Sequence, residues 1–225
     1  MKRILAAIIA AALLLSGCTS ASRPAESAPP TGTPSPSPTP VVTPTPEPEP
    51  ADDELVLVRD YIPGIFIDLK YATTDNFTGR VIYDSDEAYL RYGTVKKLLC
   101  AQNELSGRGL SLKIWDAYRP VSAQFKLWEI CPNPVYVSDP NNGYSKHSRA
   151  NTVDITLVTD TGKSIPMPSG FDDFTSLADR DYSDVSAEAA ENARLLENVM
   201  VENGFVPYSG EWWHYSDSVS YDVYE

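Results

Sequence analysis

Two histidines are the only imidazole side chains in this 225-residue chain, and each has a carboxylate close by in the sequence. His147 lies in "YSKHSRANTVDITL", seven residues before Asp154, and His214 lies in "EWWHY", three residues after Glu211. A catalytic zinc site takes three protein ligands from His, Asp, Glu or Cys and leaves one position open for water. His147, Asp154 and His214 therefore predict a site for one Zn²⁺ per chain, with Glu211 close to the metal.

The spacing of these residues indicates which elements must position them. The separation of His147 and Asp154 fits one helix face poorly, but it fits a loop that leads into a strand. We expect His214 to reach the same place on a neighbouring C-terminal strand, and Glu211 to take a proton from a water molecule whose pKa the metal lowers. A lone histidine is usually a surface or core residue with a satisfied hydrogen bond, so the prediction rests on the four residues together.

The remaining segments predict an α+β domain. Apolar alternation indicates strands, whereas helical spacing with Ser186 as an N-cap and Pro120 as an opening residue indicates helices. Strands are expected at 54–61, 64–72, 110–118, 151–158 and 205–216, a hairpin turn at 159–164, and helices at 86–105, 120–128 and 186–205. Because strands and helices alternate in mixed order, we predict a mostly antiparallel central sheet flanked by helices, in a single zinc-peptidase domain.

The first 52 residues differ in composition from the rest of the chain. Residues 1–18 combine a basic start with a short apolar run, which is typical of a secretory signal and short for a membrane span of about 20 residues. "LSGC" at 15–18 resembles the bacterial lipoprotein cleavage box, which implies lipid attachment to Cys18; the alternative is an ordinary signal peptide with a chance cysteine. Residues 19–52 are rich in Pro, Thr and Ser and predict a disordered, semi-rigid spacer.

Residues 53–225 remain for one domain, which we expect to be exported and lipid-anchored on the extracytoplasmic face of a bacterial membrane. The formal net charge of −13 argues against nucleic acid as a partner, since phosphate binding needs clusters of Lys and Arg. After Cys18 only Cys100 and Cys131 remain. In an exported chain they could form one disulfide, which the sequence leaves open, and neither has the spacing of a Cys-type zinc site.

Two segments carry a family resemblance: "SKHSRANTVDITL" together with "EWWHY" resembles the zinc D-alanyl-D-alanine dipeptidases of the VanX type. These enzymes belong to a wider metallopeptidase group that includes lysostaphin-like enzymes and the hedgehog signalling domain. The resemblance extends over nearly the whole domain, through "IDLKYATTDNFTG" at 67–79, "YDSDEAYLR" at 83–91, "LKIWDAYRP" at 112–120 and "IPMPSGFD" at 165–172. Several segments that match in the same order are a specific signal, whereas a bare histidine and aspartate seven residues apart would not be.

The resemblance implies the three zinc ligands already named and Glu211 as general base and general acid. It also implies that Arg119, in "DAYRP", stabilises the developing oxyanion. A preorganised cation suits that role because arginine cannot lose its charge, and one oxyanion-hole donor contributes roughly 3 kcal/mol. The alternative for Arg119 is a structural salt bridge to Asp116 or another carboxylate.

Three more positions match residues that contact the substrate. Asp172, in "SGFD", matches the position that holds the free ammonium group of the dipeptide. Ser145 and Tyr71 match residues that line the substrate pocket, with a turn hydroxyl and a core aromatic ring as the alternatives. In the family motif a glycine stands where this chain has Ala150, so a positive φ there would strain the backbone by roughly 1 kcal/mol.

Three functions fit these observations. The first is a zinc metallopeptidase that hydrolyses the D-Ala-D-Ala dipeptide outside the membrane, in cell-wall peptide turnover. The second is a D,D-carboxypeptidase or endopeptidase that trims longer peptidoglycan stem peptides, although a carboxylate at Asp172 suits a free amine better. The third is a non-catalytic zinc domain that binds the cell wall, against which the presence of Glu211 and Arg119 argues.

Overall fold

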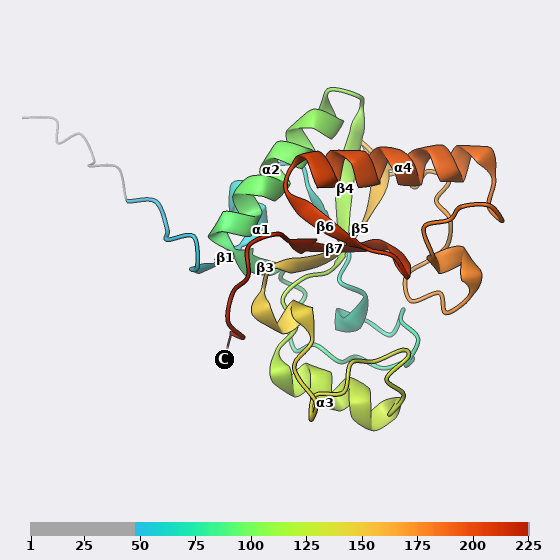
Figure 1. The fold of residues 1–225 in the computed structure, drawn as a ribbon. Helices are drawn as coiled ribbons and strands as arrows, with labels where there is room; N and C mark the ends of the chain where they lie inside the picture. Colours follow the sequence, from blue (N-terminus) through green and yellow to red (C-terminus); the bar gives the residue numbers. More distant parts are fainter. Residues whose placement is uncertain (1–47, 225) are drawn as a thin grey trace, which may run out of the picture. The chain divides into compact units, whose positions relative to one another are not determined.

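The structure, a computed structural model, describes residues 48–224 (Figure 1). The predicted signal segment, Cys18 and most of the predicted spacer lie outside these residues. Of the helices within 48–224, none combines the length and the apolar character that a membrane crossing requires.

A central sheet of five strands carries the fold, in the order β2-β4-β5-β7-β6. β2 runs parallel to β4, and the other three pairs are antiparallel. β1 and β3 form a separate antiparallel pair. The strands are β1 (Leu55–Leu57), β2 (Phe66–Ile67), β3 (Tyr89–Arg91), β4 (Leu110–Asp116), β5 (Thr152–Thr159), β6 (Phe205–Tyr208) and β7 (Glu211–Asp217). The predicted α+β class with a mostly antiparallel sheet is confirmed.

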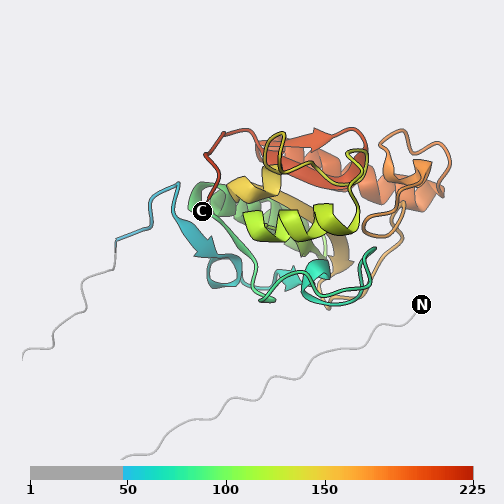
Figure 2. The ribbon, with the colours of Figure 1, turned by 90° about the horizontal axis from the view of Figure 1, so that it is seen from below.

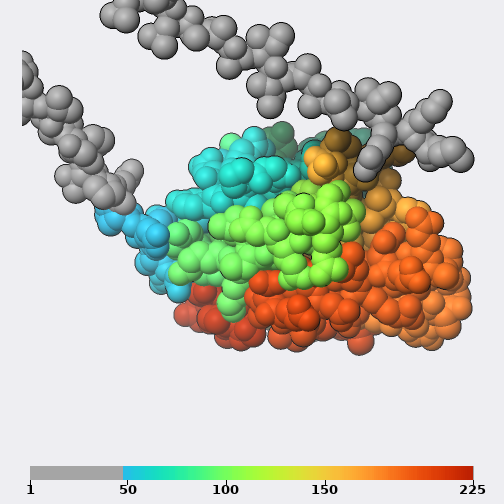
Figure 3. All heavy atoms as spheres, turned by 90° about the horizontal axis from the view of Figure 1, so that it is seen from above, coloured from blue at the N-terminus to red at the C-terminus, as the bar shows by residue number. Residues whose placement is uncertain are grey.

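Helices lie on two sides of the domain, and α2 and α4 pack against the sheet. Figures 1 and 2 show α2 and α4 together on one side of the domain and α3 on the other. In the space-filling view of Figure 3, α2 lies between α1 and α4, three segments that are far apart in sequence. Within residues 48–224 the α-helices are α1 (Val58–Tyr61), α2 (Tyr92–Ser106), α3 (Val121–Ile130) and α4 (Ala187–Glu202), and the short 3₁₀ helices are η1 (Lys70–Ala72), η2 (Lys146–Arg149) and η3 (Ser176–Ala178).

The core lies between α2, α4 and the sheet, and β5 runs through its centre. Seven of the eight residues of β5 are buried, so both faces of this strand are covered. Its apolar residues Val153, Ile155 and Leu157 alternate with polar ones, and the polar residues Asp154 and Thr156 are buried as well. Asp154 is therefore a charged residue on a covered face of the sheet, and its burial is reasonable only if other groups compensate its charge.

Several predicted bounds are wrong in ways that a sequence pattern cannot resolve. The strand expected at 54–61 ends at Leu57 and continues as α1, and the helix expected from residue 86 begins only at Tyr92, after β3. Leu90, the first leucine of that expected helix, is fully buried, but in strand β3. Because a buried leucine fits either element, helical spacing alone could not separate them.

The C-terminal segment also differs from the prediction, because 205–216 is a hairpin of two strands, β6 and β7, instead of one strand. The expected turn at 159–164 is present, with Gly162 at a positive φ of 80°. Ser186 caps α4 as predicted, since its hydroxyl accepts from the backbone N–H of Ala189. Cys100 and Cys131 are both free thiols, so the disulfide that the sequence left open does not form here.

Candidate metal and substrate site

The pairing of β5 with β7 brings two of the predicted zinc ligands together. Asp154 and His214 are direct cross-strand partners in this antiparallel pair. Side chains of directly opposed residues project from the same face, so one carboxylate and one imidazole meet there. His214 Nδ1 lies 2.9 Å from Asp154 Oδ1.

His147 reaches the same point from η2, the short helix that precedes β5. Its Nε2 lies 3.3 Å from Asp154 Oδ2 and 3.4 Å from His214 Nδ1. Its other ring nitrogen, Nδ1, lies 2.9 Å from the backbone carbonyl of Ala117. A carbonyl can only accept, so Nδ1 carries the proton and the lone pair of Nε2 faces the other two residues.

These three side chains fit a zinc ion. One ligand atom from each of His147, Asp154 and His214 lies within 4.8 Å of the others. Two imidazole nitrogens and one carboxylate oxygen are a donor set that catalytic zinc sites use. The Ala117 carbonyl supplies the outer hydrogen bond that commonly orients a metal-binding histidine. The structure therefore brings together the ligand set that the sequence predicted.

Glu211 lies beside this set and not within it. One of its carboxylate oxygens is 3.4 Å from His214 Nδ1, and the side chain lines the same cavity. Burial, followed by repulsion from Asp154, raises the pKa of Glu211 above its ordinary value, although His214 opposes the shift. A carboxylate whose pKa is raised is better suited to hold and pass on a proton near neutral pH.

The charges of the ligand set compensate one another. Burial disfavours the ionised carboxylate of Asp154, but the imidazoles of His147 and His214 outweigh burial and lower its pKa. Burial likewise lowers the pKa of His147, whereas Asp154 and Asp116 raise it, with a net rise. A cation at this place, whether a proton or a metal ion, is therefore favoured by the surrounding carboxylates.

Arg119 forms the salt bridge that the sequence offered as an alternative and still lines the cavity. Its Nε and Nη2 both donate to Asp116 Oδ2, and its Nη1 donates to the side-chain oxygen of Gln124 at 2.9 Å. A guanidinium has five N–H groups. Within residues 48–224 these contacts use three of them, which leaves two, one on each terminal nitrogen. The structural role and an oxyanion role are therefore compatible.

Asp172 and Tyr71 are joined at the other end of the cavity. The hydroxyl of Tyr71 donates to Asp172 Oδ2 at 2.7 Å, and the guanidinium of Arg119 lies over the Tyr71 ring, 5.1 Å from its centroid. Burial raises the pKa of Asp172 to about 7, partly opposed by the Tyr71 hydrogen bond. Asp172 has a positive φ of 52°, a conformation that Asp and Asn tolerate better than most residues.

Ser145 combines the two roles that the sequence offered. Its side chain accepts from the backbone N–H of His147 at 3.3 Å, as the N-cap of η2, and it also lines the cavity. The residue that ends η2, Ala150, has φ 58° and ψ 28° and is fully buried. The strained backbone considered for this position is therefore present.

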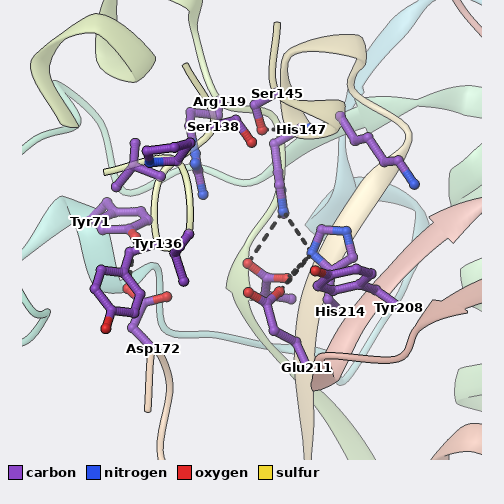
Figure 4. Close-up of a pocket in the computed structure, with 15 residues that line it drawn as sticks. Tyr71, Arg119, Tyr136, Ser138, Ser145, His147, Asp172, Tyr208, Glu211 and His214 are labelled. Carbon is purple, nitrogen blue, oxygen red and sulfur yellow. Dashed lines mark hydrogen bonds and ion pairs between the residues drawn. The ribbon is translucent and has the colours of Figure 1, made fainter. Parts of the chain in front are cut away.

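One cavity of about 240 Å³ is lined by all eight residues predicted to bind the metal, to catalyse or to contact the substrate. Figure 4 shows His147, His214 and Glu211 on one side and Tyr71, Tyr136 and Asp172 on the other, with Arg119 between His147 and Tyr71. The sites that sequence reasoning proposed from separate segments thus belong to one pocket. Its lining residues are Tyr71, Arg119, Pro134, Val135, Tyr136, Val137, Ser138, Ser145, Lys146, His147, Asp154, Asp172, Tyr208, Glu211 and His214.

Several contributors were missed from the sequence. Asp116 appeared only as a possible salt-bridge partner, yet it accepts from Arg119, the Tyr83 hydroxyl and the backbone N–H of Ala117. Gln124 gave no signal because a glutamine on a helix is usually solvent-exposed. The Ala117 carbonyl could not be found from side-chain types, since it belongs to the backbone. "DAYRP" was the one available clue to this cluster.

Comparisons with known proteins agree with the geometry. Residues 51–222 match the model of the peptidase M15 family, described as D-ala-D-ala dipeptidase. A D-alanyl-D-alanine dipeptidase of Escherichia coli (strain K12) is 39% identical over 162 residues, which cover 72% of this chain and 83% of that protein. A D-alanyl-D-alanine dipeptidase of Enterococcus faecium is 35% identical over 176 residues, which cover 69% of this chain and 87% of that protein.

A solved structure, VanYB in complex with D-Alanine-D-Alanine, is 17% identical with a TM-score of 0.41, over 60% of this chain and 75% of that chain. The family model covers most of the domain, and both dipeptidases are matched over more than two thirds of their length. The resemblance stated from the sequence is confirmed. The chain belongs to the peptidase M15 family of D-Ala-D-Ala dipeptidases and is a hydrolase of the metallopeptidase class.

Proposed function

We propose that this chain hydrolyses the dipeptide D-Ala-D-Ala in the cavity described above, as a zinc enzyme with Glu211 as general base and general acid. The observation that carries the proposal is the arrangement of one small cavity. A metal-type ligand set lies at one end, and a partly buried carboxylate, Asp172, lies at the other. A cavity of about 240 Å³ is below the usual range for drug-sized ligands, which favours a substrate as small as a dipeptide.

His147, Asp154 and His214 would hold the zinc ion. When bound, zinc supplies Lewis acidity, which polarises a carbonyl group and lowers the pKa of water. Glu211 accepts the proton that the attacking water loses and passes it to the leaving amine. Its raised pKa suits both halves of this transfer.

Arg119 and Asp172 position two different groups of the substrate, the scissile carbonyl and the free ammonium group. The two N–H groups of Arg119 not used by Asp116 and Gln124 are available to donate to the oxygen that gains charge. Asp172 pairs with the free ammonium group of the dipeptide, and the Tyr71 hydroxyl fixes the orientation of that carboxylate. A cationic partner also favours the ionised form of Asp172, which burial disfavours.

We further propose that the enzyme acts outside the membrane, in turnover of cell-wall peptides. The support is the sequence before the domain, where "LSGC" at 15–18 and the Pro-rich residues 19–52 fit a lipid anchor and a spacer. An enzyme placed there would meet peptides released from the cell wall. A dipeptidase in the cytoplasm would instead deplete the D-Ala-D-Ala from which the cell wall is built.

The test is release of alanine from D-Ala-D-Ala by the purified protein, before and after treatment with a chelator and after addition of Zn²⁺. The same assay on L-Ala-D-Ala-D-Ala measures activity toward a longer peptide. We expect release from the dipeptide that a chelator abolishes and zinc restores. Faster release from the tripeptide would contradict the proposal in favour of a carboxypeptidase, and a zinc-loaded protein that cleaves neither would favour a binding domain.

A further inference from the structure

We propose that Tyr136 and Phe174 determine substrate specificity, by closing the cavity beyond Asp172 so that peptides extended at the amine end are excluded. The inference rests on the proposed function and names the residues that would restrict it to a dipeptide. It begins from an unusual pair of aromatic side chains on the surface. Tyr136 and Phe174 are 45% and 43% exposed, yet their ring centroids lie only 4.4 Å apart.

These two rings come from different connecting segments and meet at the amine end of the cavity. Tyr136 lies between α3 and η2 and lines the cavity, whereas Phe174 lies two residues after Asp172. Figure 4 shows Tyr136 on the same side of the cavity as Tyr71 and Asp172, away from Glu211 and His214.

The pair continues an aromatic wall around Asp172. The ring centroids of Phe174 and Phe77 lie 5.4 Å apart, and those of Phe77 and Tyr71 lie 6.4 Å apart. The Tyr71 hydroxyl in turn donates a hydrogen bond to the Asp172 carboxylate. Such tilted and edge-to-face contacts between aromatic rings are favourable beyond the apolar area that they bury. The wall is therefore continuous from Tyr136 to the residue that would bind the ammonium group.

The segment that carries Tyr136 is held in place by hydrogen bonds. The backbone N–H groups of Tyr136 and Val137 both donate to the carbonyl of Asn133, at 3.0 and 2.9 Å. The side-chain amide of Gln124, whose oxygen accepts from Arg119, donates to the Ser138 carbonyl. Tyr136 is thus fixed relative to Arg119, the residue that would contact the scissile carbonyl.

The consequence for the substrate follows from position. If the ammonium nitrogen lies at Asp172, we infer that a residue attached to that nitrogen extends along Tyr136, which lines this end of the cavity and packs against Phe174. In the structure these rings are in contact, so an extended peptide would have to separate them. Two effects then favour a dipeptide over a longer peptide. The charge on Asp172 favours a free ammonium group, and the contact between the two rings sterically excludes an extended chain.

The test compares kcat/KM for D-Ala-D-Ala and L-Ala-D-Ala-D-Ala in Tyr136→Ala and Phe174→Ala. We expect the ratio of tripeptide to dipeptide activity to rise about tenfold or more in each variant, the range in which pocket size discriminates between substrates. Both side chains are half-exposed, so neither variant is expected to unfold, and two independent variants guard against misfolding of one.

Two controls make the comparison specific. Tyr136→Phe keeps the ring, so the ratio should stay close to that of the unchanged protein. Tyr144→Ala removes a similarly exposed tyrosine (43%) from the same segment but outside the cavity lining, and the ratio should not change. An unchanged ratio in Tyr136→Ala and Phe174→Ala, in a protein that cleaves the dipeptide, would overturn this inference alone. A protein that cleaves neither peptide would overturn the proposed function.

Discussion

Asp172 has an ionisable group whose state changes near neutral pH, because burial raises its pKa to about 7. Below that pH the carboxyl group is protonated and pairs poorly with an ammonium group. We therefore expect KM for D-Ala-D-Ala to fall as pH rises through about 7, measured by steady-state kinetics. Asp172→Asn should have a high KM without this step, and Asn tolerates the positive φ of 52° at this position.

The same shift has an opposite consequence for stability. The pKa of Asp172 is higher in the fold than its ordinary value of 3.8, so folding favours the protonated acid. This contribution is present below about pH 4 and is lost as the pH rises toward 7.

The kinetic prediction has a clear contrary outcome. If KM of the unchanged protein and of Asp172→Asn varied with pH in the same way, Asp172 would not be the ammonium-binding group.

Ala150 adopts a left-handed conformation that a glycine would adopt without strain. Ala150→Gly removes about 1–2 kcal/mol of strain, but it adds about 0.4–1 kcal/mol of unfolded-state entropy and loses a buried methyl group of about 0.8 kcal/mol. We therefore expect its free energy of unfolding to change by less than about 1 kcal/mol, measured by urea denaturation.

Ala150→Val is the contrasting variant, because a β-branched residue at a positive φ is a severe outlier and this site is fully buried. We expect it to destabilise the protein by about 3 kcal/mol or more. Equal stability of the valine and glycine variants would show that backbone strain at Ala150 has no influence on the fold.

The residues predicted from the sequence were those whose side chains differ chemically from their surroundings. Two histidines in the whole chain and an aspartate inside an apolar strand were conspicuous, and the structure brings them together. The Ala117 carbonyl, Gln124 and the contact between Tyr136 and Phe174 were not foreseen. They depend on backbone positions and on loops that meet only in three dimensions, so residue types carried no signal for them.

Among the elements, β5 and β7 matter most, because their register places Asp154 opposite His214. A slip by one residue would move His214 to the other face of the sheet. The sequence predicted both strands and their proximity, since each has a strong apolar pattern. It missed the split between β6 and β7, the early end of β1 and the short β3, because strands of three or four residues are too short for periodicity to define.

Arg180 holds the β6–β7 hairpin that carries His214 and Glu211. Its guanidinium donates to the carbonyls of Tyr208, at 2.7 Å, and His214, at 3.1 Å, and so contacts both strands. It lies 4.6 Å above the Tyr215 ring. We expect Arg180→Gln to weaken zinc affinity about 10–100-fold, as loss of outer contacts to metal ligands does, measured by competition with a chelator.

The matched control is Arg108→Gln, which removes an arginine from an exposed ion pair with Glu104 on α2. Zinc affinity of that variant should be unchanged, since exposed pairs of this kind contribute little. Equal zinc affinity in Arg180→Gln and the unchanged protein would show that the hairpin holds His214 in place without Arg180.

For the whole molecule, the composition of the first 52 residues differs from that of the family domain, and we proposed above that they anchor it. If Cys18 carries the lipid, Cys18→Ser should lose incorporation of a labelled fatty acid and move from the membrane fraction to the soluble fraction. The dipeptidase activity of that variant should be retained, because residues 51–222 contain the family domain. Membrane association that survives the substitution would contradict the lipid anchor.

The proposed mechanism depends above all on Glu211, which lies beside the ligand set without belonging to it. The decisive measurement is the rate of D-Ala-D-Ala hydrolysis by Glu211→Gln, with zinc content determined on the same sample. We expect one zinc ion per chain and a rate lower by about 10²–10⁴-fold, the usual contribution of a general acid–base group. A fully active variant, or loss of zinc together with activity, would contradict the role assigned to Glu211.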